Sequence, residues 1–174
     1  MKSGLIKEII SWILWMAGGL VLAFILVTFV FRLTVVKGES MNETLQNEQV
    51  LYVDKLSYNF ISPNRGDIVI CEYPNSNQKY IKRVIGLPGE TIYIKDSVVY
   101  INGVAGIDLW NGNHDIGDMN AVQIPDGYYF VMGDNRSNSS DSREKSVGPI
   151  SEEAILGRAL FSISPIGKIE FKTK

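Results

Sequence analysis

The sequence has very few residues of the kinds that bind metals or form cross-links. It contains a single cysteine, Cys71, and a single histidine, His114, among 174 residues. One cysteine excludes an internal disulfide, and one histidine leaves no cluster of ligands for zinc. A Ser-His-Asp triad would have to use His114, which lies in a polar run typical of a solvated loop. We therefore expect neither a bound metal nor a cofactor.

An excess of basic residues is also missing. The chain carries 17 Lys and Arg against 19 Asp and Glu, for a formal net charge of -2. Proteins that bind nucleic acid usually have a basic patch and a high isoelectric point. Nucleic acid is therefore not an expected partner.

Charged residues are absent from one long stretch near the N-terminus, between Glu8 and Arg32. The uncharged residues 9–31 would form about 34 Å of helix at 1.5 Å per residue, enough to cross a bilayer. A cleavable secretory signal would have a shorter apolar core of about 7–15 residues and a small-x-small cleavage site. Neither feature is present. We therefore expect a short tail over residues 1–8, an uncleaved transmembrane helix over 9–31, and the lipid bilayer as a partner.

The remaining residues, 33–174, have the length of one domain. They consist mostly of short apolar runs broken by Gly, Pro, Asn and Asp. The runs expected to form strands are 50–53, 68–71, 80–85, 91–94, 98–101, 128–132 and 159–163. A polar stretch covers 108–118, and residues 151–156 resemble a capped short helix. The predicted fold is mainly β, with one N-terminal transmembrane helix followed by an antiparallel β-sheet or barrel-like catalytic domain.

A candidate nucleophile, Ser40, lies just after the apolar segment, between Glu39 and Met41. The nearby Gly38 would let the backbone approach a ligand closely. A serine in this setting is more commonly a turn residue. Because a serine hydroxyl is a poor nucleophile, a catalytic role requires a base elsewhere in the chain.

The candidate base is a lysine whose charged form is disfavoured by burial. The reference pKa of lysine is about 10.4, and burial can lower it by up to about 3–5 units. In the expected strand 80–85, side chains alternate between faces, so Lys82 shares a face with Tyr80 and Val84, while Arg83 points away. The alternative is a surface lysine whose stem covers its neighbours while its amine reaches water.

A polar cluster over residues 133–143 follows directly on the apolar run that ends at Met132. It contains two carboxylates, two guanidinium groups and several hydroxyls. Such a group can orient a lysine and fix a loop through charge-assisted hydrogen bonds. A hydrophilic loop without a specific role is the alternative.

Four segments, in this order, resemble the motifs of bacterial type I signal peptidases, the membrane-bound Ser-Lys proteases that remove signal peptides from exported preproteins. They are residues 38–45, 65–69, 80–90 and 133–143. The short length and single span are similar to the forms found in Gram-positive bacteria. The resemblance implies a single-pass serine endopeptidase of the cell membrane with its β domain, residues 33–174, on the extracytoplasmic face. Preproteins would be its substrates, and the secretion translocase is a candidate partner.

The resemblance also implies roles for individual residues. Ser40 would be the nucleophile and Lys82 the general base. The supporting residues would be Ser139, bonded to the lysine amine, and the pairs Asp134–Arg83 and Asp141–Arg143. The pockets for the Ala-x-Ala side chains of the substrate would be lined by Val36, Met41, Leu45, Tyr80 and Ile81.

The chain departs from the family pattern at two positions. Glu43 stands where the family usually has a proline, which removes a restraint on the nucleophile loop. Gly38 stands where some relatives carry a serine that helps to bind the oxyanion, so backbone N–H groups, chiefly that of Ser40, would have this role.

The sequence leaves two alternative functions to consider. The departure at Glu43 keeps open a catalytically inactive, peptidase-like membrane protein that binds preproteins or other partners. A self-cleaving, repressor-like Ser-Lys protease is disfavoured, because it would carry a DNA-binding domain where this chain has a membrane helix.

Overall fold

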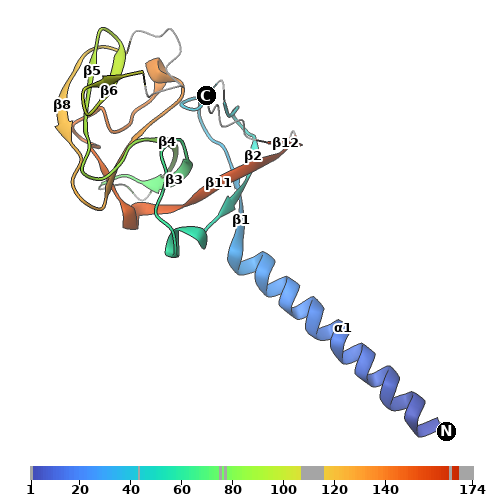
Figure 1. Ribbon diagram of the computed structural model, residues 1–174. Helices are drawn as coiled ribbons and strands as arrows, with labels where there is room; N and C mark the ends of the chain where they lie inside the picture. Colours follow the sequence, from blue (N-terminus) through green and yellow to red (C-terminus); the bar gives the residue numbers. More distant parts are fainter. Residues whose placement is uncertain are drawn as a thin grey trace.

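One long helix and a β domain make up the protein (Figure 1). The structure is a computed structural model and describes residues 2–42, 44–74, 76, 78–106, 116–164 and 166–168. The predicted mainly β fold with one N-terminal helix is confirmed. The predictions made for Glu43 and His114, and most of the polar stretch 108–118, lie outside the described residues.

The helix, α1, runs from Lys2 to Val30 and projects away from the β domain (Figure 1). Its segment Gly4–Phe24 has a mean hydropathy of 1.7, and none of it is buried within the protein. By length and composition this segment can cross a membrane. The helix begins at Lys2, so most of the predicted N-terminal tail is helical rather than irregular. Which of its residues span a bilayer stays a prediction.

Two antiparallel sheets form the β domain. The larger has the strand order β1-β2-β11-β3-β4-β9-β10, with β12 paired to β11. Its strands are β1 (Phe31–Val35), β2 (Val50–Asp54), β3 (Ile68–Glu72), β4 (Lys79–Gly86), β9 (Tyr128–Met132), β10 (Ile150–Ser151), β11 (Ile155–Ser164) and β12 (Ile166–Lys168).

The smaller sheet has the order β7-β6-β5-β8 and lies at the end of the domain remote from α1 (Figure 1). Its strands are β5 (Thr91–Lys95), β6 (Val98–Ile101), β7 (Val104–Ala105) and β8 (Met119–Gln123). The β5–β6 hairpin agrees with the sequence prediction. The short strands β1, β7 and β8 were not predicted.

Strand β11 holds the two halves of the larger sheet together. It pairs with β2 through Arg158–Ser164 and with β3 through Ile155–Arg158. In the described ladders, the β1–β2 hairpin is therefore connected to the β3–β4 hairpin only through β11. This arrangement sets the distance between the loop that joins β1 to β2 and the side chains of β4.

The predicted helix over residues 151–156 is largely wrong. A short 3-10 turn covers Glu152–Ala154, and the Ser151 side chain makes no capping hydrogen bond. Ile155 already belongs to β11, which begins four residues before the predicted strand 159–163. Pairing of this apolar segment with β3 is more favourable than an isolated helix of so few residues, which is marginal in water.

Alternating side chains fill the interior on both sides of the larger sheet. On one side of β3, Ile68 and Ile70 pack with the nucleophile loop and with β2 and β11. On the other side, Val69 and Cys71 pack with residues of β4 and β9. A third apolar cluster joins β4 and β9 to the smaller sheet. From Lys82 to Gly86 the strand β4 is thus buried, which fixes these side chains in place.

Replacing Gly157 with alanine should lower the free energy of unfolding by about 1–3 kcal/mol. A Cβ at this position of β11 would collide with the backbone of Asp54 and press on the side chain of Val53. Gly18→Ala is a matched control, because a Cβ there would touch nothing. Chemical denaturation of the full chain in detergent, followed by circular dichroism, compares the two. Equal midpoints for both variants would contradict the role assigned to β11.

Candidate active site

Ser40 lies in a tight turn of the loop that joins β1 to β2. Asn42 donates its N–H to the Glu39 carbonyl at 3.0 Å, which closes the turn around Ser40. Gly38 adopts a φ of 97°, a left-handed conformation that favours glycine, and its N–H donates to Asn47 Oδ1 at 2.9 Å. Met41 is buried in the apolar cluster beneath the loop. The turn is therefore anchored from below, and Ser40 remains only half-buried.

Lys82 reaches the same point from strand β4, where it lies opposite Val69 of β3. Its side chain is only 2% exposed, and its Nζ lies 2.7 Å from Ser40 Oγ. Tyr80 and Val84 pack in one apolar cluster, while Ile81 packs against another, as the predicted alternation requires. The alternative of a surface lysine is thus wrong.

The surroundings of Lys82 favour its neutral form. Burial lowers the pKa of the Lys82 amine below its ordinary value. The Asp141 carboxylate acts in the opposite direction, and the Arg143 guanidinium adds to the lowering. The neighbouring Cys71 is fully buried, and burial raises the pKa of its thiol to about 12. The thiol is therefore neutral at neutral pH.

Arg83, the next residue of β4, points to the opposite side and forms a buried ion pair. Its Nε and Nη2 donate to the two carboxylate oxygens of Asp134 at 2.8 and 2.6 Å, and both residues are almost fully buried. Its Nη1 also donates to the Gly66 carbonyl at 2.8 Å. This pair ties the segment after β9 to the start of β3.

Asp141 and Arg143 form the second ion pair. Arg143 Nε and Nη2 donate to the Asp141 carboxylate at 2.8 and 2.9 Å. Asp141 also accepts the N–H of Gly133 at 3.0 Å, and Arg143 donates to the Ser139 carbonyl at 3.2 Å. Both pairings expected from the family resemblance are present, and together they fold the segment 133–143 over the Ser40 turn.

The expected hydrogen bond from Ser139 to the Lys82 amine is not made. Ser139 Oγ is buried and has no hydrogen-bond partner among the described residues. It lies against Gly133, where a Cβ would collide with both Ser139 Oγ and the Ser40 carbonyl oxygen. Only a glycine at position 133 lets the two segments approach this closely.

Asn135 has a role that the sequence did not reveal. Its backbone N–H donates to the Ser40 carbonyl, and its side-chain amide donates to the Glu39 carbonyl, each at 3.0 Å. Asn138 adds a contact to Glu39 Oε2 at 3.3 Å. Both carbonyls of the turn are thereby satisfied, whereas no described group accepts the Ser40 N–H. The sequence placed Asn135 in the polar cluster, but its contacts depend on the tertiary fold.

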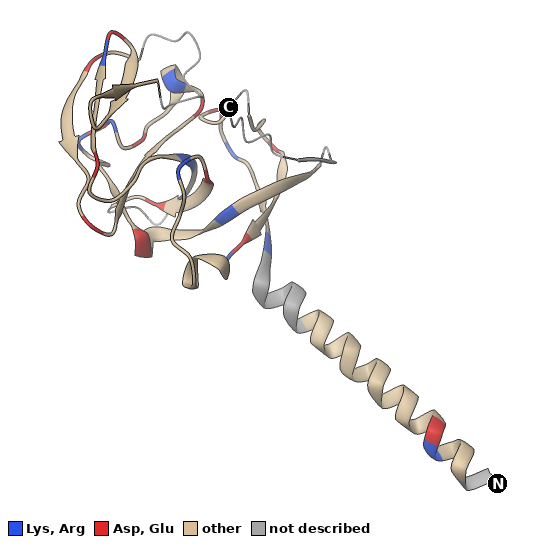
Figure 2. Cartoon of the chain, in the orientation of Figure 1, with Lys and Arg blue, Asp and Glu red and all other residues tan. Residues whose placement is uncertain are grey.

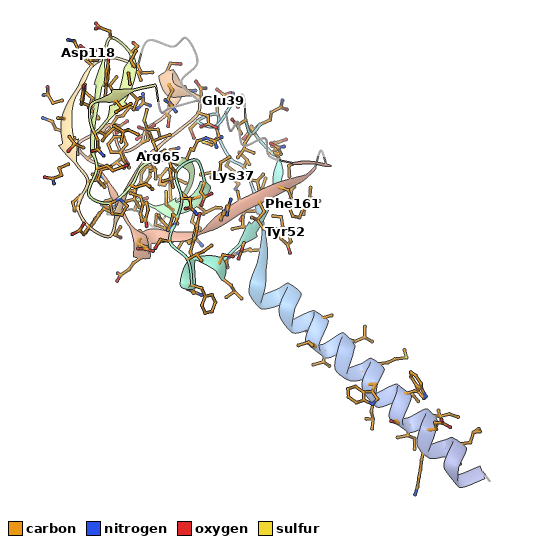
Figure 3. All side chains as sticks on the ribbon, in the orientation of Figure 1. Lys37, Glu39, Tyr52, Arg65, Asp118 and Phe161 are labelled. Atoms are coloured by element: carbon orange, nitrogen blue, oxygen red, sulfur yellow. The ribbon has the colours of Figure 1, made fainter. Side chains whose placement is uncertain are left out.

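A groove of about 230 Å³ opens beside Ser40 and Lys82. Four of the five residues predicted to contact substrate line it, namely Val36, Met41, Tyr80 and Ile81. Leu45 is not among the lining residues, and its side chain packs in the apolar core beneath the loop. Gly38, expected to allow close approach of a ligand, also lines the groove, and the lining residues that the sequence did not suggest are Thr34, Val35, Lys37, Ile70 and Lys79. Figure 3 labels Lys37 and Glu39, which flank Gly38 on this loop.

Comparison with known proteins identifies the family. Residues 9–164 match the family described as signal peptidase, peptidase S26. Signal peptidase I T of Bacillus subtilis is 41% identical over 85% of this chain and 81% of its own length. Signal peptidase I of Bacillus licheniformis is 35% identical over 94% and 92%. Signal peptidase IB of Staphylococcus aureus is 32% identical over 95% and 94%.

A crystal structure of a signal peptidase I from Enterococcus faecalis is also similar. It is 34% identical, covers 56% of this chain and 97% of its own, and has a TM-score of 0.49. The relatives are hydrolases, and the protein is therefore a peptidase. The chain belongs to the signal peptidase family, peptidase S26, and its function is the removal of signal peptides.

Removing the charge of Asp134 should strongly destabilise the fold. In Asp134→Asn, Arg83 would remain buried without a counter-charge, which costs about 3–5 kcal/mol. The control is Asp126→Asn, at an exposed position. Thermal melting of the full chain in detergent measures both variants, and a melting temperature for Asp134→Asn close to that of the control would refute this account of the ion pair.

Proposed function

We propose that the protein cleaves preproteins by acyl transfer to Ser40, with Lys82 as the general base. The observation that carries this proposal is the 2.7 Å contact between Lys82 Nζ and Ser40 Oγ, made by an amine whose pKa is lowered by burial. A neutral amine at hydrogen-bond distance can accept the hydroxyl proton as the oxygen attacks.

The reaction has two steps in which each proton has a defined path. Lys82 Nζ takes the proton of Ser40 Oγ while the oxygen bonds to the scissile carbonyl carbon. The resulting ammonium protonates the leaving nitrogen as the C–N bond breaks, which leaves an ester on Ser40. Lys82 then accepts a proton from a water that attacks the ester, and returns it to Ser40 Oγ as the bond between Oγ and the carbonyl carbon breaks, which releases the acid and restores the serine.

The backbone N–H of Ser40 is the proposed donor to the oxyanion. It points from a turn whose carbonyls at Glu39 and Ser40 are already bonded to Asn135. The turn cannot easily rotate, so the N–H is held in place before the negative charge develops. Preorganised donors of this kind give the largest electrostatic contribution in acyl transfer.

We assign the Ala-x-Ala preference to the groove beside the catalytic pair. Strand β1 pairs with β2 along one edge only, and β9 pairs with β4 only from Arg83 onward. The edges of β1 and of residues 79–82 therefore remain open to an extended peptide, which can add to them as a strand. Val36, Met41 and Ile81 would form shallow walls that accept small side chains.

Membrane anchoring by α1 follows from its apolar composition and from the family. We further propose that α1 spans the membrane once and that the β domain lies on the extracytoplasmic face, where exported preproteins emerge. Basic residues flank both ends of the helix, so they give no orientation by themselves. Preproteins delivered by the secretion translocase are the proposed substrates.

Ser40→Ala and Lys82→Met should each lower the rate of preprotein processing by roughly a thousandfold or more. The Lys82→Met protein should melt at the same or a higher temperature than the unchanged chain, because a buried amine is replaced by an apolar side chain of similar length. Exposed Lys145→Met is the control.

Processing of a preprotein by the full chain in lipid vesicles measures the rates. Full activity in either variant would reject the proposed pair, and an unchanged chain without activity would favour the inactive, peptidase-like alternative.

The pH dependence of cleavage should report the titration of Lys82. Only the neutral amine can act as base, so kcat/KM should fall about tenfold for each pH unit below the pKa of Lys82. Because burial lowers that pKa, the midpoint should lie below about 10.4, the reference value for lysine. A midpoint at or above this value, or no rise in rate with pH, would show that the Lys82 amine is not the base.

A further inference from the structure

A second pocket, of about 250 Å³, lies next to the groove. It is formed where the chain leaves α1 and enters the β domain, between β1, the end of β2 and the start of β4. The residues that line it are Arg32, Leu33, Thr34, Val35, Lys37, Val53, Lys55, Ile70, Lys79 and Leu156.

The rim of this pocket is strongly basic. Arg32, Lys37, Lys55 and Lys79 all contribute to it, and no Asp or Glu lines it. None of these four cations forms an ion pair within the described part of the chain. Glu72 lies opposite Lys79 in the β3–β4 ladder and offsets part of its charge, but it is not in the lining. Such a concentration of positive charge is unexpected in a chain with a net charge of -2.

The floor of the pocket is apolar. Val53 and Ile70 are buried members of the core and form its base together with Leu156. Leu33 and Val35 add exposed apolar surface at the mouth. A ligand that satisfies both parts has to carry an anionic group and a short apolar segment. Free phosphate has only the first.

The pocket lies at the level where a bilayer surface is expected. Arg32 is two residues beyond Val30, the last residue of α1, and pairs with Val53 in the β1–β2 ladder. Figure 2 shows blue segments at the junction of the helix with the β domain. The nearby loop around the 3-10 turn Ser57–Asn59 (η1) carries Phe60, which is 84% exposed. Apolar and basic side chains occur together in this way on surfaces that contact lipid headgroups.

We propose that this pocket binds the headgroup of an anionic phospholipid from the bilayer that α1 crosses. The cations at the rim would surround the phosphate, and Val53, Ile70 and Leu156 would contact the glycerol and the first methylenes. Phosphate groups attract clustered Lys and Arg near a membrane surface. An acidic segment of a preprotein is the competing occupant, since Thr34, Val35 and Lys79 also line the groove, but it does not explain why Arg32 lies beside the end of α1. The proposal does not depend on the catalytic roles of Ser40 and Lys82.

The test compares the retention of two lipids by the full chain. The protein in detergent is mixed with dioleoylphosphatidylglycerol or with dioleoylphosphatidylcholine, and bound lipid is counted by native mass spectrometry. The unchanged chain should retain the anionic lipid preferentially. Arg32→Gln and Lys55→Gln should each weaken this retention roughly fivefold, because one cation at the phosphate is lost. These two residues line this pocket and not the groove.

Matched variants separate this site from general electrostatic attraction. Lys95→Gln and Lys145→Gln remove the same charge at exposed positions outside the pocket and should leave retention unchanged. Lys55→Arg keeps the charge and should retain the lipid, which distinguishes loss of the cation from disturbance of the fold.

Three results would overturn the proposal. The first is a lack of specificity: the unchanged chain retains both lipids equally, or the pocket and control variants lose the same amount of bound anionic lipid. The second is displacement of the lipid by millimolar inorganic phosphate, which would indicate a site for a free anion. The third is unchanged lipid retention in Arg32→Gln and Lys55→Gln together with a raised KM for a preprotein in phosphatidylcholine vesicles, which would assign the pocket to the substrate.

Discussion

The site depends on the cost of holding the Lys82 amine away from water. A buried ammonium is unfavourable unless a carboxylate is free to pair with it. Asp141, the carboxylate that acts most strongly on Lys82, already accepts two bonds from the Arg143 side chain and one from the Gly133 N–H. The Asp141 carboxylate is thus already paired with Arg143 and has little capacity left to stabilise a charged Lys82. The amine is left with the Ser40 hydroxyl as its hydrogen-bond partner, and burial lowers the pKa of the amine below its ordinary value.

The charges around the amine are arranged in pairs that neutralise each other. Arg83 with Asp134, and Arg143 with Asp141, place two positive and two negative groups in the interior close to the site. Each pair has a near-bidentate geometry, which fixes orientation as well as charge. Both pairs involve the segment 133–143, and the same segment bonds to the backbone carbonyls of Glu39 and Ser40. Within this hydrophilic segment the carboxylates of Asp134 and Asp141 are therefore buried and held in place, while Ser137, Asn138 and Ser140 stay exposed.

Local patterns predicted much of this arrangement. Period-two alternation over 80–85 correctly separated Lys82 from Arg83, because that strand is packed on both faces. The pairing of Asp134 with Arg83 and of Asp141 with Arg143 followed from the family resemblance rather than from spacing.

Features that depend on the contact of distant segments were missed or wrong. Leu45 packs into the core because the loop folds back over β2 and β3, and loop spacing does not carry that information. The bonds of Asn135 to the Ser40 turn and the unpartnered Ser139 hydroxyl likewise exist only once β9 lies beside β4.

The position of β11 late in the sequence affects when, during synthesis of the chain, the two hairpins can be joined. Ser40 follows the first strand of the sheet and Lys82 lies in the fourth, yet the ladder that joins their two hairpins runs through a strand that ends at Ser164. A nascent chain that has not yet emerged from the ribosome as far as this strand has both reactive groups but nothing to align them. Under the proposed mechanism, alignment of Ser40 with Lys82 therefore requires the chain as far as the end of β11.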